Sequence, residues 1–271
     1  MKKVILILLF VILSSFYVLG NTIAYWKFDE GSSNQVFDET ANNNDGTISG
    51  VANWTTDSIS GHALEFDGID DKIAITKTSS VDLTDNVVLE AYVKRKSNTD
   101  GIIISKNGPY FLGIRDNVTA GGVYANDGNC PTSCITPGAN TWTEIHGTTV
   151  LEQYIWYKLK MEYNDTNVNI YVNDILDGSA SKIGQMPQVS QGVNLGWGEP
   201  GQNQFFTGII DEAKISTINE TIPDQDIEER LGELENRVDE LEEMVEEQEL
   251  LLQKIIDFIK KLPKGLRRYW E

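Results

Sequence analysis

Between residues 22 and 217, short stretches of alternating hydrophobic and polar residues are separated by turn-forming residues. A period of two places successive side chains on opposite faces of a β-strand. Asn, Asp and Gly fill the intervening segments, as at Asp67-Gly68 and Asn107-Gly108, and favour tight turns. No helical period lies between the stretches, so we expect antiparallel strands in an all-β, two-sheet sandwich or jelly roll. The pattern predicts strands at 23–28, 72–76, 87–93, 101–105, 110–114, 157–163, 168–172 and 208–215.

A second pattern runs from Ile227 to Leu262, where apolar residues recur in steps of four and three. About five heptads kept in phase predict a C-terminal α-helical coiled coil. The a positions are Leu231, Val238, Val245, Leu252 and Ile259, and the d positions are Ile227, Leu234, Leu241, Gln248, Ile255 and Leu262. The alternative is a single amphipathic helix packed on the sandwich, which a two-residue seam of this length disfavours.

Charges beside this seam favour self-association. Arg230 and Arg237 at g would face Glu235 and Glu242 at e of a parallel neighbour, so we expect a parallel homo-oligomer. Val at a with Leu at d favours dimers. Apolar residues at e and g widen the stripe and favour three or more strands; they are Met244, Leu251, Ile256 and Phe258.

The first twenty residues have the pattern of a secretory signal peptide. Lys2 and Lys3 precede an unbroken apolar run over 4–13, and Gly20 offers a small residue for cleavage. An uncleaved anchor is the alternative, but the apolar stretch 4–19 is short of the roughly 20 residues that span a bilayer. No later segment is long and apolar enough to span, so we expect a secreted, extracellular protein.

The sequence therefore divides into a signal peptide at 1–20, a sandwich at 21–217, a linker at 218–226, a coiled coil at 227–262 and a basic aromatic tail at 263–271. Pro263 ends the predicted helix. The tail carries Lys264, Arg267 and Arg268 beside Tyr269 and Trp270. It is either a frayed, solvated end or a contact for an acidic surface.

Charge and cysteine content exclude some functions. The chain has 41 Asp and Glu against 22 Lys and Arg, a formal net charge of −19, so nucleic acid is not an expected partner. Two Cys and two His leave little room for zinc chemistry. In an oxidising compartment, Cys130 and Cys134 would close a small disulfide loop. A redox or metal pair is the alternative, but no second Cys pair accompanies them.

Six blocks in the sandwich fall in the order used by one family. They are 24–31 with 38–47 (AYWKFDEG, DETANNNDGT), 63–73 (ALEFDGIDDKI), 89–94 (LEAYVK), 156–159 (WYKL), 170–174 (IYVND) and 206–215 (FTGIIDEAKI). In this order the segment resembles laminin-G-like (concanavalin A-like) jelly-roll domains. The resemblance implies a double-sheet jelly roll that serves mostly as an adhesion or carbohydrate-binding module.

The resemblance also implies one structural calcium ion that ties the first strand to the last. Calcium takes six to eight oxygen ligands from carboxylates and carbonyls. The matching positions are Asp29, the Asp67-Gly68 turn and Asp211, and the first loop would add Asn43 and Asp45. The alternative is that these residues cap turns through their own backbone.

Sugar recognition needs aromatic faces beside polar groups. We expect them in the segment 124–147, taken as a long loop, and in the loop 196–204. The candidate ligand-binding residues are Asn126, Asp127, Trp142 and Trp197. Alternatively Trp142 and Trp197 close the ends of the core, and we expect Trp156 to pack inside.

Catalysis is not expected. Glucanases with a related sandwich carry two carboxylates at alternating positions of one strand, as in Glu-x-Asp-x-Glu. The nearest match, Glu65-Phe66-Asp67, is interrupted by Gly68. His62 and His146 stand without a G-x-S-x-G motif. We expect a non-catalytic adhesion or carbohydrate-binding module whose partner is a glycan or an extracellular protein. A structural subunit of a surface layer or appendage is the alternative, and a glycan hydrolase is less favoured.

Overall fold

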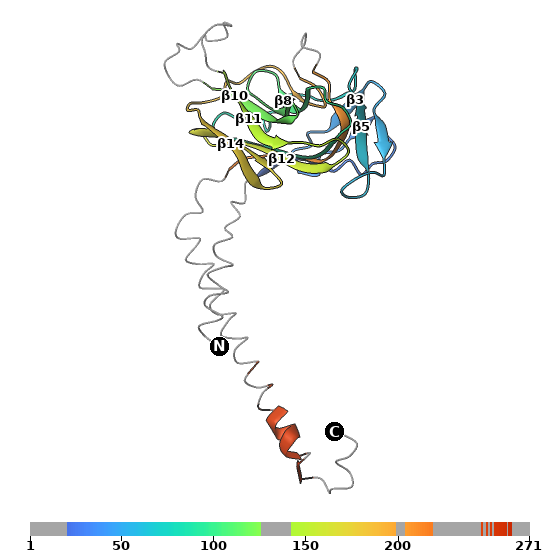
Figure 1. Ribbon diagram of the computed structural model, residues 1–271, viewed down its shortest axis with the longest axis vertical. Helices are drawn as coiled ribbons and strands as arrows, with labels where there is room; N and C mark the ends of the chain where they lie inside the picture. The colour runs from blue at the N-terminus through green and yellow to red at the C-terminus, as the bar shows by residue number, and fades with distance from the viewer. Residues whose placement is uncertain are drawn as a thin grey trace. The chain divides into compact units, whose positions relative to one another are not determined.

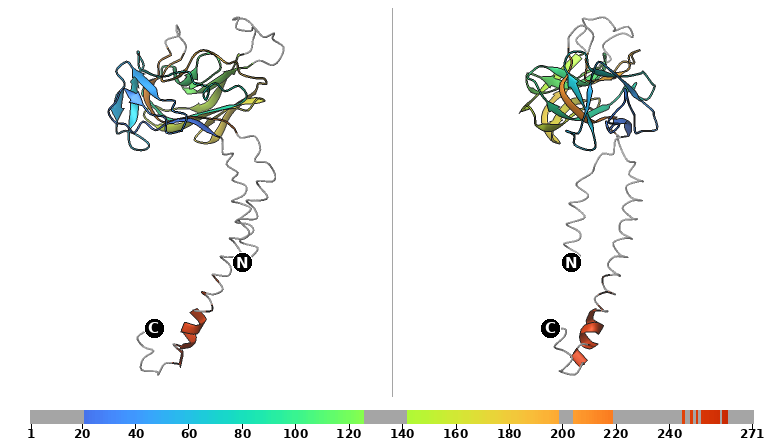
Figure 2. Two further views of the ribbon diagram at one scale, coloured as in Figure 1. Left: turned by 180° about the vertical axis from the view of Figure 1, so that it is seen from behind. Right: turned by 90° about the vertical axis from the view of Figure 1, so that its right-hand side faces the viewer.

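The computed structural model describes residues 21–125, 142–198 and 204–218, and, in a helix, residues 245, 248, 250, 252–258, 260 and 261. The chain separates into two compact units, Met1–Asn219 and Glu220–Glu271. The strands of the first unit lie in two stacked layers (Figures 1 and 2). The predicted two-sheet antiparallel jelly roll is confirmed, and all pairs of described strands are antiparallel.

One layer, the first sheet, has the order β14-β13-β12-β7-β16-β5-β4, and β1 also pairs with β16. Its strands are β1 (Thr22–Trp26), β4 (Asn53–Thr55), β5 (Ala63–Asp67), β7 (Val87–Arg95), β12 (Trp156–Tyr163), β13 (Asn167–Val172), β14 (Ile175–Ser181) and β16 (Thr207–Ser216). Thr22 pairs with Ser216, and Thr217 donates its N–H to the carbonyl of Asn21 at 3.0 Å. The two ends of the sandwich therefore lie side by side in the first sheet.

The other layer, the second sheet, has the order β11-β10-β9-β8-β15-β6-β3-β2. Its strands are β2 (Gln35–Val36), β3 (Gly46–Ser49), β6 (Lys72–Ile75), β8 (Gly101–Lys106), β9 (Tyr110–Arg115), β10 (Val118–Tyr124), β11 (Trp142–Val150) and β15 (Val193–Leu195). The edges of the two sheets meet where Thr148 and Thr149 donate hydrogen bonds to Asp177 of β14. These contacts close one side of the sandwich.

The core lies between the sheets and follows the alternation of the sequence. In β7 every second residue from Val87 to Arg95 is buried, and the residues between them are partly exposed. Trp26, Phe28 and Phe66 fill the core with large side chains that are at most 1% exposed. Full burial of a side chain of this kind contributes about 1.5–3 kcal/mol, so the core favours the fold strongly.

All eight strands predicted from the alternation are present, within one or two residues at each end. The prediction of a loop throughout 124–147 is wrong for its last part, because β11 begins at Trp142. Trp156 was expected inside but is only partly buried. The register of β12 directs Leu159, Met161 and Tyr163 into the core, so Trp156 points outward and its Nε1 donates to Asp57 at 3.4 Å.

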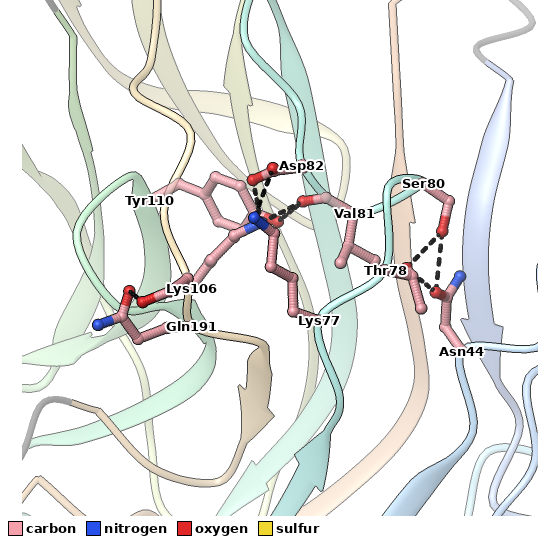
Figure 3. Close-up of polar contacts among 10 residues, drawn as sticks. Asn44, Lys77, Thr78, Ser80, Val81, Asp82, Lys106, Tyr110 and Gln191 are labelled. Carbon is pink, nitrogen blue, oxygen red and sulfur yellow. Dashed lines mark hydrogen bonds and ion pairs between the residues drawn. The ribbon is translucent and has the colours of Figure 1, made fainter.

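A buried lysine anchors the segment between β6 and β7 (Figure 3). Nζ of Lys106, which is 1% exposed, lies 2.9 Å from the carbonyl of Val81 and 2.7 Å from Oδ1 of Asp82. Nζ of Lys77 lies 3.1 Å from the other carboxylate oxygen of Asp82. Thr78 and Ser80 both donate to Oδ1 of Asn44. The first part of the connection is therefore held by polar groups of neighbouring elements.

The described residues of the second unit are helical, in agreement with the predicted helix. Apolar a and d residues on it are exposed, including Leu252 at 58% and Ile255 at 47%. Assembly of this helix with other chains stays a prediction. Among the described residues, no helix combines the length and the apolar character needed to cross a membrane. The predicted signal peptide, most of the linker, the tail, Cys130 and Cys134 lie outside the described residues.

Candidate functional site

One row of side chains crosses the outer face of the second sheet. The pairing of neighbouring strands fixes its members, which are Glu144, Gly122, Phe111, Ser105, Asn194, Ala74 and Thr47. Their sequence neighbours, such as Tyr110 and Leu112 in β9, belong to the core between the sheets. Because alternate residues point to opposite faces, this row points away from the core. Gly122, Phe111 and Ser105 are buried within the row, so its accessible members lie towards its two ends, with Glu144 at one of them.

Trp142 covers one end of this row. Its ring stacks on Phe111, with 5.7 Å between the ring centroids and 12° between the planes. Phe111 is 6% exposed beneath it, whereas Trp142 itself is 41% exposed. A Cβ atom at Gly122, on the strand between them, would lie only 2.8 Å from Cε1 of Phe111. Glycine therefore lets the phenyl ring lean across β10 and support an exposed indole.

Charged groups surround this aromatic pair. The guanidinium carbon of Arg115 lies 5.7 Å from the ring centroid of Phe111. Oε1 of Glu144 lies 3.5 Å from Nε of Arg115 and 3.0 Å from Nε2 of His146. Trp142, Glu144 and His146 are alternate residues of β11 and share its outer face. We call Phe111, Arg115, Trp142, Glu144 and His146 the Trp142 surface.

Trp197, the second predicted aromatic, has a different environment. Nζ of Lys72 lies 4.2 Å from the centroid of its ring, and Phe205 contacts the ring at 6.0 Å between centroids. Its carbonyl accepts a hydrogen bond from Ser105 at 2.8 Å. These contacts anchor a partly buried Trp197 to the sheet, so Trp142 offers the more accessible ring. The other predicted ligand-binding residues, Asn126 and Asp127, lie outside the described residues.

On the outer face of the first sheet, aromatic rings are paired with lysines of the same sheet. One row there reads Tyr171, Lys160, Glu90, Lys214 and Tyr25 across four strand pairings. Nζ of Lys160 lies 3.8 Å from the Tyr171 centroid, and Nζ of Lys214 lies 4.6 Å from the Tyr25 centroid. The ammonium groups of Lys160 and Lys214 therefore lie over the tyrosine rings of this row, whereas the ring of Trp142 is 41% exposed.

Two of the predicted calcium ligands hold the segment 59–62. Oδ1 of Asp29 accepts the N–H of His62 at 3.0 Å. Asp211 is fully buried in β16, and its Oδ2 accepts the N–H groups of Ile59 and Ser60 at 2.7 and 3.3 Å. Burial raises the pKa of Asp211 to about 6. Both carboxylates thus bind backbone amides.

The other predicted ligands lie in two further places. Oδ1 of Asp45 accepts the N–H of Asp38 at 2.8 Å, and the amide of Asn43 donates to the carbonyl of Ala41. In the turn after β5, Oδ1 of Asp67 accepts the N–H of Ile69 at 2.7 Å. Gly68 adopts a positive φ of 79° there, as the turn requires.

The described contacts place the six residues in three groups. Among the described residues, one acidic cluster is close enough to share a cation: Asp67, Asp70 and Asp71, with ligand atoms within 4.8 Å. Asp71 already accepts the N–H groups of Val51 and Asp67 at 2.6 and 2.9 Å, and burial raises its pKa. These contacts are those of turn-capping acids, and calcium binding by the expected set stays a prediction.

The sequence pointed to Trp142 but not to its partners. Alternation in Trp142-Thr-Glu144-Ile-His146 is a strand signal that puts three side chains on one face. The contact with Phe111 depends on the pairing of β9, β10 and β11, which no local pattern gives.

The family model described as the concanavalin A-like lectin/glucanases superfamily (Laminin_G_3) matches residues 67–224, more than half of the chain. No curated protein matches the sequence.

Solved structures share the fold at low identity. The binding domain of Paraclostridial Mosquitocidal Protein 1 has a TM-score of 0.58 and 10% identity, covering 76% of this chain and 51% of that one. Domain 4 of AbnA, an extracellular arabinanase from Geobacillus stearothermophilus, was solved in complex with arabinotriose. It has a TM-score of 0.56 and 18% identity, covering 74% of this chain and 95% of that one. The binding domain of botulinum neurotoxin DC in complex with SialylT has a TM-score of 0.54 and 13% identity, covering 76% of this chain and 50% of that one. The chain spans about half the length of the two toxin domains.

Proposed function

This chain belongs to the concanavalin A-like lectin/glucanases superfamily, and from that premise we propose that its sandwich is a non-catalytic module that binds a glycan at the Trp142 surface. The observation that carries the proposal is the exposed indole of Trp142, held on Phe111 beside Glu144 and His146. An aromatic ring offers a flat apolar face to the C–H groups of a sugar. Neighbouring polar groups then bind the hydroxyls and fix orientation.

Two of the structural neighbours support this assignment by their own ligands. The arabinanase domain was solved with arabinotriose and a neurotoxin binding domain with SialylT. The absence of a Glu-x-Asp-x-Glu run in the sequence supports binding without hydrolysis.

Secretion and multivalent display complete the proposal. The predicted signal peptide at 1–20 would export the chain, and the heptads at 227–262 would join several copies. The ends of the sandwich lie in the first sheet, whereas the Trp142 surface is on the outer face of the second sheet. The ends therefore leave the Trp142 surface clear. Joining several weak sites raises avidity through effective concentration.

The test is calorimetric titration of the full chain with oligosaccharides selected on a glycan array. Trp142→Ala should abolish binding while the chain stays folded, because the ring is 41% exposed and lies outside the core between the sheets. Tyr154→Ala is the matched control, since Tyr154 is also an exposed aromatic, at 61%. Binding that survives Trp142→Ala unchanged would contradict the proposal.

A second candidate is a structural subunit that packs against copies of itself. Ile175 and Leu176 favour it, because they are 73% and 56% exposed on β14, an edge strand of the first sheet. Exposed apolar edge strands pair readily with other chains. If the sandwich alone, residues 21–218, self-associates and Ile175→Lys prevents it, this candidate gains support.

A further inference from the structure

One carboxylate oxygen of Glu144 is without a partner among the described residues. Oε1 is shared by Arg115 and His146, at 3.5 and 3.0 Å. Oε2 has no hydrogen-bond or ion-pair partner within the part of the chain that the structure describes. The side chain is 29% exposed. Glu144 therefore holds a hydrogen-bond acceptor in a defined position at the solvent boundary of the Trp142 surface.

This acceptor lies within reach of a sugar that stacks on Trp142. Residues two apart on a strand are separated by roughly 6.8 Å and point to the same side. A ring on the indole thus brings its own hydroxyls, or those of the next ring, towards Oε2 of Glu144. A carboxylate accepts hydrogen bonds from hydroxyls but cannot donate one when ionised. A sugar hydroxyl, which can donate a hydrogen bond, is therefore favoured beside Oε2 of Glu144.

The charge around the site disfavours anions. Arg115 is the one guanidinium of the Trp142 surface, and two carboxylates face it: Nε lies 3.5 Å from Glu144, and Nη1 lies 3.9 Å from Oδ2 of Asp100. The two carboxylates outweigh this single guanidinium by one negative charge. The chain as a whole carries −19. An acidic sugar would bring a second carboxylate to Oε2 of Glu144, where like charges repel.

We infer that the Trp142 surface takes a neutral glycan, and that Glu144 is the residue that binds a sugar hydroxyl and excludes acidic sugars. The inference rests on the proposed function and narrows it, since the neighbours' ligands include both a neutral sugar, arabinotriose, and SialylT. Glu144 acts here as a specificity-determining residue beside the stacking platform.

The experiment titrates the full chain with arabinotriose, maltotriose and cellotriose, and in parallel with sialyllactose and tri-galacturonic acid, at 50 and 500 mM NaCl. At least one neutral trisaccharide should bind, with an affinity that changes less than about twofold between the two salt concentrations. The acidic sugars should bind about tenfold more weakly or not at all.

Two substitutions separate the two roles of Glu144. Glu144→Ala removes the acceptor and should weaken neutral binding by about tenfold or more, as for a hydrogen bond to a charged group. Glu144→Gln keeps an acceptor and removes the charge, so it should reduce the discrimination against acidic sugars severalfold. Glu39→Gln is the control, because Glu39 is an exposed acid outside the Trp142 surface and its loss changes the net charge equally.

The outcomes are distinguishable. Tighter binding of an acidic sugar, weakened by salt, would overturn the inference and leave the proposed glycan-binding function standing. Unchanged discrimination in Glu144→Gln would also overturn it. If no sugar of either class binds, or if Trp142→Ala binds as the parent does, the proposed function itself fails and the inference falls with it.

Discussion

The indole of Trp142 and the phenyl ring of Phe111 lie nearly parallel, 5.7 Å apart between centroids, although one intervening strand separates β11 from β9. The contact is possible because Gly122 leaves the space between them open. The contact with Phe111 restricts the orientations of the exposed Trp142 side chain before any ligand binds. A platform ordered in advance loses less conformational entropy on binding.

This relationship predicts the effect of changing Phe111. Phe111→Leu keeps most of the apolar volume but removes the flat support, so affinity for the glycan should fall severalfold. Stability should fall by less than about 1.5 kcal/mol, as for a volume-conserving exchange. Calorimetric titration measures the first quantity and urea unfolding the second. An unchanged affinity would show that Trp142 needs no support from Phe111.

Alternation predicted the strands whose two faces differ in environment. β7 is the clearest case, because one face packs in the core and the other is partly exposed. Alternation does not predict β10, because this strand contains Gly121 and Gly122 and is buried along most of its length. Gly121 is required where a Cβ atom would lie 2.6 Å from Cγ of Met161. The close contact between the sheets therefore requires glycine at this position. A glycine there interrupts the alternation of hydrophobic and polar residues that predicts a strand.

The candidate site was predicted only in part, because a local pattern does not show which distant strands pair. Trp142 stood out by residue type, but Phe111 and Arg115 reach it through the pairing of distant strands. The resemblance, in contrast, indicated that the distant residues Asp29 and Asp211 lie near each other, and both do contact the segment 59–62. The groups that they bind there are backbone amides.

These amide contacts predict that calcium is not needed for stability. The carboxylates of Asp29, Asp45, Asp67 and Asp211 already accept backbone N–H groups in three separate places. The melting temperature of the full chain should be the same in 1 mM CaCl₂ as in excess chelator. An ion bound only by the folded state would raise the melting temperature, by an amount that grows with the logarithm of the ion concentration once this exceeds Kd. A rise that Asp67→Asn removes would instead identify the Asp67–Asp70–Asp71 turn as a cation site.

Asp82 allows a comparison of two lysines on one carboxylate. Lys106 is 1% exposed and lies 2.7 Å from Oδ1, whereas Lys77 is 38% exposed and lies 3.1 Å from Oδ2 (Figure 3). Lys106→Met leaves a buried acid without its buried partner and should cost about 3–5 kcal/mol. Lys77→Met should cost about 0–1 kcal/mol, as for an exposed pair. Equal losses in urea unfolding would contradict the assigned difference in burial.

Asp211 predicts a pH dependence of stability with a defined sign. Burial raises its pKa in the folded chain from the ordinary 3.8 to about 6. The folded state then binds the proton more tightly than the unfolded state does. The stabilising contribution is fully present below about pH 4 and is lost as the pH rises to about 6.

The comparison of the parent with Asp211→Asn isolates this contribution, since other carboxylates act in the opposite sense. Hydrogen bonds and charge interactions with lysines lower the pKa of Asp57 and Asp82. Between pH 4 and 7 the parent should lose about 1–3 kcal/mol relative to Asp211→Asn. Glu39→Gln serves as the control and should track the parent. A difference that stays constant with pH would show that Asp211 titrates normally.

Two leucines of the C-terminal helix provide the test of oligomerisation. Leu252 and Leu250 are exposed to nearly the same extent, 58% and 57%. Leu252 is at an a position of the predicted heptads, whereas Leu250 is at f, away from the seam. Light scattering should give the full chain a mass that is a multiple of the monomer. Leu252→Glu should lower this mass, because a charge in the seam would be buried against its copies, while Leu250→Glu should leave it unchanged. If both variants and the parent are monomeric, the helix is not a coiled coil and the proposed multivalent display fails, although the Trp142 surface can still bind its glycan as a single site.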